Sequence, residues 1–250
     1  MFSLFKKKVV LPSSFDIVGD IIILNKEVKH LKQVAKELLK RHKHVKTVLL
    51  KTGKYQGKFR TPRLKVIYGE NKKITLHKEN KVTLKLNVEK CYFSQRTASE
   101  RLRIAKQVKP KESVLVMFSG VAAFPLVIEK NANPKELLGI EINPIAHKYA
   151  EENLKLNKSK KIRLIQGDVI DILPKIRKKF NRIIMPLPKD SITYLPLAKS
   201  KLKKNGTIHL YVFGEEKDIP LLKKQYKTRK IIKCGQASPR VYRLCVEISR

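Results

Sequence analysis

The chain has 250 residues, 42% of them hydrophobic, so it is long enough and apolar enough to bury a sizeable core. Its 57 Lys and Arg residues outnumber its 21 Asp and Glu residues, which gives a formal net charge of +36. Such a charge repels itself unless a polyanion neutralises it, and it therefore indicates a nucleic-acid partner. A Lys-rich solvated surface is the alternative interpretation, but Glu does not rise together with Lys here as it does in proteins from hot habitats.

Several other classes of protein are excluded. The longest uncharged run, Ser113–Ile128, is too short for a membrane span of about 20 residues. The N-terminal segment MFSLFKKKVV lacks the apolar region of a signal peptide. Cys91, Cys234 and Cys245 form no CxxC motif and are odd in number. This argues against a structural metal and for a reducing compartment, the cytoplasm.

The first 90 residues are typical of a small α+β domain. After a basic lead-in over residues 1–12, the run Ser13–Asn25 is rich in β-branched residues and predicts a strand. Apolar residues recur at helical spacing over Lys26–His44, and the opposite face of that predicted helix is basic. An antiparallel sheet under this helix would be completed by strands at Val45–Leu50, Lys65–Tyr68, Ile74–His77 and Lys81–Val88.

Residues 113–168 predict the centre of an α/β sheet. The apolar run Val114–Phe118 is typical of a parallel strand buried on both faces, and it ends at the small residues Ser119 and Gly120. A second strand, Leu137–Ile142, carries Glu141 at its end, and a third, Ile162–Gln166, is followed by Asp168. Open α/β sheets bind ligands at the carboxyl edge, and an acid after the second strand suits a ribose diol. The pattern predicts a nucleoside site.

The turn after the first strand reads Ser-Gly-Val-Ala-Ala, with a single glycine. A dinucleotide site would need more glycine for close approach of the pyrophosphate. S-adenosylmethionine needs no phosphate cradle and therefore fits better than NAD. The alternative is a sheet that binds no ligand, in which Glu141 and Asp168 are ordinary acids at strand ends.

The remaining segments complete the sheet. A fourth strand, Arg182–Pro188, runs into a proline-rich loop, and a helix over Ile192–Lys204 is predicted to stop at Asn205-Gly206. The last strands are predicted at Thr207–Phe213, Arg229–Cys234 and Val241–Ile248. We expect a seven-stranded sheet over residues 91–250 whose last strand is antiparallel.

The segment KCYFSQRTASERLR, Lys90–Arg103, closely resembles a block of the archaeal and eukaryotic tRNA guanine-N1 methyltransferases that act at tRNA position 37. The segments PSSFDIVGDIIIL, HKHVKTVLLK, GKFRTPR, MFSG, GIEINPIAHKYAEENLKLNK and GTIHLYVF resemble the same family in the same order. The resemblance covers almost the whole chain. It implies a Rossmann-like class I methyltransferase sheet preceded by a small α+β domain that contacts RNA.

The resemblance also implies roles for two residues. Glu100 matches the family's general base for the guanine N1 proton, and a weakly acidic lactam N–H does need a positioned base. Arg60 matches the arginine that stabilises negative charge on guanine O6. Without the resemblance, a cap of the following helix is the better interpretation of Glu100. For Arg60, a solvated or phosphate-binding arginine is then an equally good interpretation.

The cofactor and substrate positions of the family fall on a larger set of residues. For Phe118 the alternative is core packing, and for Tyr92 it is packing at a domain interface. The matching residues are Tyr92, Arg96, Arg101, Phe118, Ser119, Gly120, Glu141, Ile142, Asp168, Val169 and Pro186.

Three positions depart from the family pattern. Val116 stands where the family usually has Asp, and Ala122 replaces the second glycine of the turn. The third departure is MPLP, Met185–Pro188, where many members have Asn-Leu-Pro. With Pro186, this segment resembles that of the archaeal subgroup that also methylates a carbon of the tricyclic wyosine precursor. The alternative is that Pro186 is only a rigid turn residue.

The resemblance thus implies an S-adenosylmethionine-dependent methyltransferase for N1 of guanosine 37, working as a monomer on the anticodon stem-loop without a metal. Two alternatives stay open. One is transfer of the aminocarboxypropyl group of the same cofactor, as in related wyosine enzymes. The other, motivated by Val116 and Ala122, is an RNA-binding protein with a degenerate cofactor site.

Overall fold

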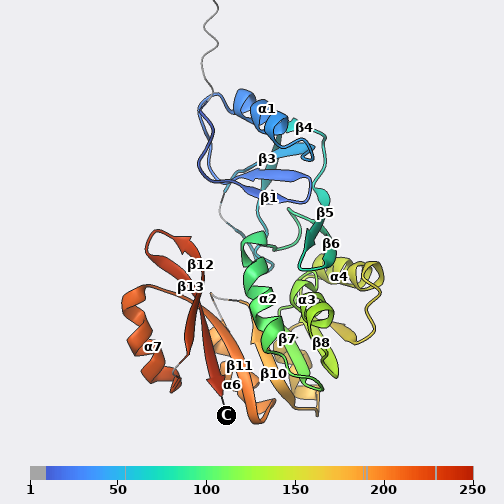
Figure 1. Ribbon diagram of the computed structural model, residues 1–250, viewed down its shortest axis with the longest axis vertical. Coiled ribbons are helices and arrows are strands. Elements are labelled where there is room, and N and C mark those ends of the chain that lie inside the picture. The colour runs from blue at the N-terminus through green and yellow to red at the C-terminus, as the bar shows by residue number, and fades with distance from the viewer. Residues whose placement is uncertain (1–9, 54, 188, 190, 229, 250) are drawn as a thin grey trace, which may run out of the picture. The chain divides into compact units, whose positions relative to one another are not determined.

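A computed structural model describes residues 10–53, 55–187, 189, 191–228 and 230–249. The chain divides into two compact units (Figure 1). The first comprises Met1–His77 and Lys85–Gln95, and the second comprises Lys78–Leu84 and Arg96–Arg250. The division runs through a hairpin of β5 (Ile74–Glu79) and β6 (Val82–Asn87), whose tip belongs to the second unit.

The first unit contains a four-stranded sheet with one helix packed on it. The apolar face of α1 (Leu31–Arg41) buries Val34, Ala35 and Leu38 in a core with residues of the second and third strands. In spatial order the strands are β1 (Asp16–Val18), β2 (Ile21–Leu24), β3 (Thr47–Lys51) and β4 (Leu64–Gly69).

This sheet differs from the prediction in three ways. The strands predicted at Ile74–His77 and Lys81–Val88 are not part of it, because the turn at Asn80-Lys81 pairs them with each other as the separate two-stranded sheet of β5 and β6. Residues 13–25 form two antiparallel strands instead of one, because the chain reverses at Gly19-Asp20. Gly19 has φ +56°, and a Cβ there would lie 2.1 Å from Thr75 Oγ1, so only glycine fits this turn. The sheet is mixed rather than antiparallel, since β2 and β3 are joined through α1 and a crossover of this kind makes the two strands parallel.

The second unit is a seven-stranded sheet in the order β12-β13-β11-β10-β7-β8-β9. Pairing is parallel from β11 through β9, and only β13 runs against its neighbours. The predicted fold class, with the last strand antiparallel, is confirmed. The strands are β7 (Ser113–Met117), β8 (Glu136–Glu141), β9 (Ile162–Gln166), β10 (Phe180–Met185), β11 (Leu202–Gly214), β12 (Ile231–Ser238) and β13 (Val241–Ser249).

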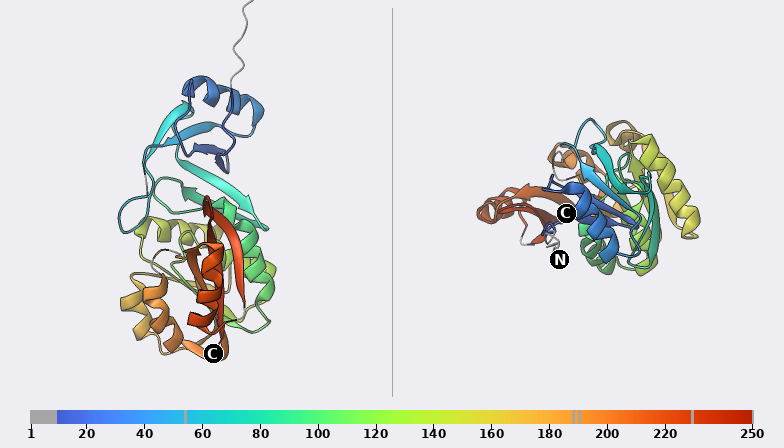
Figure 2. Two further views of the ribbon diagram at one scale, coloured as in Figure 1. Left: turned by 90° about the vertical axis from the view of Figure 1, so that its left-hand side faces the viewer. Right: turned by 90° about the horizontal axis from the view of Figure 1, so that it is seen from above.

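Helices cover both faces of this sheet (Figure 2). Alternate residues of the strands, such as Leu115, Ile183 and Leu210, form one core with the three helices nearest the C-terminus. The three earlier helices of this unit pack on the opposite face of the sheet. The helices are α2 (Ala98–Gln107), α3 (Ala123–Asn131), α4 (Pro144–Leu156), α5 (Val169–Ile172), α6 (Leu195–Ser200) and α7 (Ile219–Tyr226). Within the described residues, none of the helices is both long and apolar enough to cross a membrane.

The helix predicted over Ile192–Lys204 is wrong at its C-terminal end. A 3-10 turn, Ser191–Tyr194, leads into α6, and β11 already begins at Leu202, which is buried and pairs with Phe180. Asn205, at φ 61°, and Gly206 therefore form an irregularity inside the strand instead of a helix stop. Parts of other predicted segments lie outside the described residues, namely Pro188, Arg229 and residues 1–9 of the basic N-terminal segment.

Candidate active site

The turn after β7 is tightly wound. Phe118 has φ 59° and Gly120 has φ 56°, and the amide of Ser119 donates to the carbonyl of Ile140 at 2.9 Å. The hydroxyl of Ser119 is buried and has no hydrogen-bond partner among the residues that the structure describes. The turn thus offers a polar group that a bound molecule could satisfy. The ring of Phe118 packs edge-on against Tyr194 at 4.9 Å between centroids.

Glu141 ends β8 beside this turn. Its Oε2 accepts a hydrogen bond from the amide of Gly120 at 2.7 Å, and its Oε1 accepts one from the amide of Asn143 at 2.8 Å. Burial raises the pKa of Glu141, and these backbone bonds oppose that effect. The structure therefore brings Ser119, Gly120 and Glu141 together, and further hydroxyl donors would stabilise the buried Glu141 carboxylate.

The end of β9 lies next to the end of β8, the strand that carries Glu141. The amide of Gly167 donates to the carbonyl of Glu141 at 2.9 Å. Asp168 caps α5 by accepting a hydrogen bond from the amide of Ile170 at 3.1 Å, while Val169 is buried in the core. Asp168 thus has a structural task, which does not exclude contact with a ligand. Ile142, directly after Glu141, is half-buried.

Pro186 follows β10 at the same edge of the sheet. The amide of Leu187 donates to the carbonyl of Met185 at 2.9 Å, so the three residues form a narrow turn with Pro186 at its centre. The proline has no N–H to offer a ligand, and its fixed φ stiffens the turn.

Glu100 lies on α2 with only 3% of its surface exposed. Its Oε1 accepts hydrogen bonds from the Tyr211 hydroxyl at 2.5 Å and from Arg103 Nη2 at 2.8 Å. Its Oε2 accepts one from Arg103 Nε at 2.6 Å. The candidate base is therefore a buried carboxylate held by two side chains.

Two other predicted residues flank Glu100 in sequence. Arg101 is buried and forms a two-pronged ion pair with Glu79, at 2.5 and 2.6 Å, and a hydrogen bond to the Thr97 hydroxyl at 2.6 Å. Arg96 is exposed on the 3-10 turn Gln95–Thr97. The guanidinium of Arg101 is thus already engaged by the protein.

Arg60 and Tyr92 belong to the first unit, whereas Glu100 belongs to the second. Arg60 has φ 52° and ends a tight turn in which its amide donates to the carbonyl of Gly57 at 3.1 Å. A left-handed conformation is costly for arginine and is typical of residues kept for function. Tyr92 is 38% exposed and packs edge-on against Tyr55.

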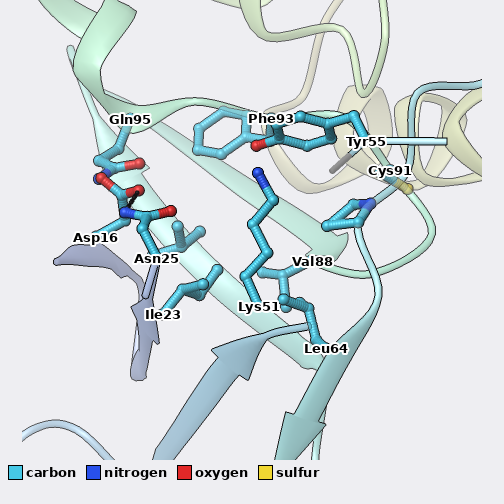
Figure 3. A pocket seen from close by; sticks show the side chains of 12 residues that line it. Asp16, Ile23, Asn25, Lys51, Tyr55, Leu64, Val88, Cys91, Phe93 and Gln95 are labelled. Carbon is cyan, nitrogen blue, oxygen red and sulfur yellow. Dashed lines mark hydrogen bonds between the residues drawn. The ribbon is translucent and has the colours of Figure 1, made fainter. Parts of the chain in front are cut away.

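The first unit contains a small pocket that the sequence pattern does not predict (Figure 3). The ammonium of Lys51 points into it and lies 3.7 Å from the centroid of the Tyr55 ring. On one wall, Asp16 accepts hydrogen bonds from Asn25 at 2.9 Å and from Gln95 at 2.7 Å. Burial lowers the pKa of Lys51. A lysine at the end of an apolar strand was the one signal for it in the sequence.

The described residues contain a buried cluster of three potential metal ligands, namely His209, Cys245 and Glu247. Glu247 connects it to Glu100 through Arg103. Glu247 forms ion pairs with Arg103 at 2.9 Å and Lys230 at 2.8 Å, and Arg182 contacts His209 Nε2 at 2.6 Å. Lys230 and Arg103 hold the pKa of Glu247 at about 2, and burial together with Arg182 lowers the pKa of His209 to about 3. Three cations at the cluster would repel a metal ion, so it is better described as an ion-pair network.

Comparison with known proteins gives a consistent result. Residues 75–236 match the TRM5/TYW2 methyltransferase domain, and residues 5–72 match the TYW2 N-terminal domain. The chain is 43% identical over 211 residues to the tRNA (guanine(37)-N(1))-methyltransferase Trm5b of Pyrococcus abyssi, covering 83% of this chain. It spans only 62% of the length of that relative.

A second relative is matched over most of its length. The chain is 35% identical over 257 residues to the tRNA (guanine(37)-N(1))/4-demethylwyosine(37)-methyltransferase Taw22 of Nanoarchaeum equitans, covering 82% of this chain and 86% of the relative. Among solved structures, a complex of aTrm5 with tRNALeu superposes with a TM-score of 0.83 at 32% identity, covering 95% of this chain and 72% of that one. The chain belongs to the TRM5/TYW2 methyltransferase family.

Proposed function

We propose that this protein transfers a methyl group from S-adenosylmethionine to N1 of guanosine 37 of tRNA. The observation that carries this proposal is the buried, doubly held carboxylate of Glu100, in the unit that also bears the nucleoside-type edge at Glu141. Relatives named for this reaction support it.

Residues at the sheet edge fit the cofactor. The Glu141 carboxylate would accept hydrogen bonds from the ribose hydroxyls, and the buried hydroxyl of Ser119 would find a partner. Phe118, Ile142, Asp168 and Val169 would surround the adenosine. When bound, S-adenosylmethionine supplies a methyl group on a sulfonium, which is the electrophile of the reaction. Arg101, paired with Glu79, would act by fixing α2 and not by direct contact.

Glu100 and Arg60 would act on the guanine. As N1 gains the methyl group, the N1 proton passes to the Glu100 carboxylate. Glu100 thereby becomes a neutral carboxylic acid, and the methylated guanine is uncharged. Arg60 would stabilise the negative charge that develops on O6. No metal is needed for these steps.

The first unit and the basic surface would grip the anticodon stem-loop, since a charge of +36 suits a phosphate backbone. The target base must leave its stack to be reached. We propose that the protein works as a monomer in the cytoplasm, where its three free cysteines would stay reduced.

A second methylation is favoured by Pro186. In place of an amide that could read the guanine, the loop presents a proline in a narrow turn. The Nanoarchaeum relative is named for both guanine-N1 and 4-demethylwyosine methylation. We propose that this protein also methylates a carbon of the 4-demethylwyosine precursor at position 37.

The test is nucleoside mass spectrometry of tRNA transcript incubated with the protein and labelled S-adenosylmethionine. The expected product is 1-methylguanosine at position 37, and tRNA carrying 4-demethylwyosine should also gain one methyl group. Glu100→Gln should slow the transfer to guanosine about 10²–10⁴-fold. Glu151→Gln, at an exposed position of α4, is the matched control and should leave the rate unchanged.

Other products would contradict the proposal. A mass gain larger than one methyl group would identify an aminocarboxypropyl transferase. Folded protein that binds tRNA but leaves it unlabelled, with no saturable binding of S-adenosylmethionine, would identify an RNA-binding protein with a degenerate cofactor site.

A further inference from the structure

The two oxygens of Glu100 are not equivalent. Oε1 accepts two hydrogen bonds, from Tyr211 and Arg103, whereas Oε2 accepts one, from Arg103. An ionised carboxylate has about four lone-pair positions, so a single position is left and it lies on Oε2. Glu100 has no further hydrogen-bond partner among the described residues.

The hydroxyl of Tyr211 donates its hydrogen bond to Glu100. Tyr211 lies in the middle of β11, is fully buried, and its hydroxyl makes no other hydrogen bond within the described part of the chain. Burial and the nearby carboxylate raise the pKa of Tyr211 well above its usual range. The hydroxyl is therefore the donor in its hydrogen bond to Glu100.

Arg103 is itself oriented by a second carboxylate, that of Glu247. Its Nη1 donates to Glu247 Oε1 at 2.9 Å, and Glu247 also accepts hydrogen bonds from Gln107 at 3.1 Å and Lys230 at 2.8 Å. The guanidinium is thus anchored to β13 on one side while it grips both Glu100 oxygens on the other. Such a fork fixes the orientation of a carboxylate more closely than a single bond does.

We propose that Tyr211 and Arg103 are positioning residues that lock the Glu100 carboxylate so that Oε2 takes the guanine N1 proton. This inference rests on the proposed function. A carboxylate that could rotate would present either oxygen to the substrate, and the two donors remove that freedom.

The titratable groups around Glu100 have pKa values far from neutral pH. Burial raises the pKa of Cys234 to about 12 and that of Cys245 well above its usual range. Beyond these thiols, Glu247 has a pKa of about 2 and His209 of about 3, and Arg103 has its pKa raised. None of these groups changes charge between pH 5 and 9. A change in the pH profile of the rate over that range therefore does not come from these neighbouring groups.

The experiment is the single-turnover methyl-transfer rate of the full chain as a function of pH, for the wild type and Tyr211→Phe, with tRNA transcript and S-adenosylmethionine both saturating. Loss of one donor to a charged group should slow transfer about 10- to 100-fold. It should also move the acid limb of the rate, its fall at low pH, to higher pH. The affinities for tRNA and S-adenosylmethionine should not change.

Tyr226→Phe is the matched control, because the Tyr226 hydroxyl is buried but has no hydrogen-bond partner among the described residues. Its rate and pH profile should equal those of the wild type. Folded Tyr211→Phe with a wild-type rate and an unmoved acid limb would overturn the inference. An inactive wild type would instead overturn the proposed function.

Arg103→Lys keeps the charge and removes the fork, and it carries the test if Tyr211→Phe does not fold. The expected result is again a slower transfer with the acid limb moved to higher pH. A folded Arg103→Lys protein with the profile of the wild type would show that orientation of the carboxylate is not limiting, and would overturn the inference.

Discussion

Two buried carboxylates of the second unit are held in opposite ways. Glu141 is held by backbone amides, those of Gly120 and Asn143, which belong to the turns next to it. Glu100 is held by the side chains of Tyr211 and Arg103, and Arg103 in turn depends on Glu247. Most side-chain substitutions around Glu141 should therefore leave its orientation unchanged, whereas a single substitution can remove a hydrogen bond that orients Glu100.

The largest effect is expected where the backbone-held carboxylate is itself removed. Glu141→Ala deletes the acceptor for the ribose hydroxyls, and two hydrogen bonds to a charged group are together worth several kcal/mol, so the affinity for S-adenosylmethionine should fall at least about 100-fold. Isothermal titration calorimetry measures this directly. Binding of tRNA should persist, and Glu151→Ala should behave as wild type. Unchanged cofactor affinity would remove Glu141 from the site.

An intermediate effect is expected in the side-chain network. Glu247→Gln takes the charge partner from Arg103 and Lys230, and should lower the stability at pH 7 by about 1–3 kcal/mol. Because the folded pKa of Glu247 is about 2, below its value in the unfolded chain, its stabilisation is present above about pH 4.5 and is lost as the pH falls toward 2.

Melting temperatures between pH 7 and pH 3 test this expectation. The Glu247→Gln protein should melt lower at pH 7, and its melting temperature should fall less steeply than that of the wild type below pH 4.5. Glu216→Gln, which breaks an exposed pair with Lys233, is the control and should change neither value. Parallel curves for Glu247→Gln and wild type would contradict the assignment.

The smallest effect concerns the turn that supports Glu141. Ala122 is buried with φ 65°, a conformation that costs an alanine about 1–2 kcal/mol. Ala122→Gly relieves this strain but loses a buried methyl group worth about 0.8 kcal/mol. We expect a rise in melting temperature of at most about 3 °C. The same change in the helix α6, Ala198→Gly, should lower the melting temperature, and a fall for Ala122→Gly would show that strain is not the dominant factor.

The backbone-held region was largely predictable from the sequence. An apolar run, a small-residue turn and an acid at the next strand end are contiguous signals, and β9 was predicted with the bounds found, Ile162–Gln166. Resemblance to a family singled out Glu100. The turn at Gly19 was missed because β-branched residues on both sides outweighed a single glycine.

The side-chain network could not be predicted. Tyr211 lies 111 residues from Glu100 and Glu247 lies 144 residues from Arg103, and nothing local pairs them. Alternation in a strand places His209 and Tyr211 on one face of β11, but that pattern equally suits a plain core. Asn205-Gly206 was misread for a similar reason, because the pairing of Leu202 with Phe180 decides where the helix must end.

Arg182 gives His209 an unusual property. Arginine can only donate, so Nε2 of the fully buried imidazole must accept, and the ring proton is confined to Nδ1. With a pKa near 3, this single tautomer persists across the whole physiological range. In a protein labelled with ¹⁵N-histidine, His209 should give resonances that stay fixed with pH while exposed histidines shift. His209 is thus a built-in spectroscopic reporter beside the carboxylate network.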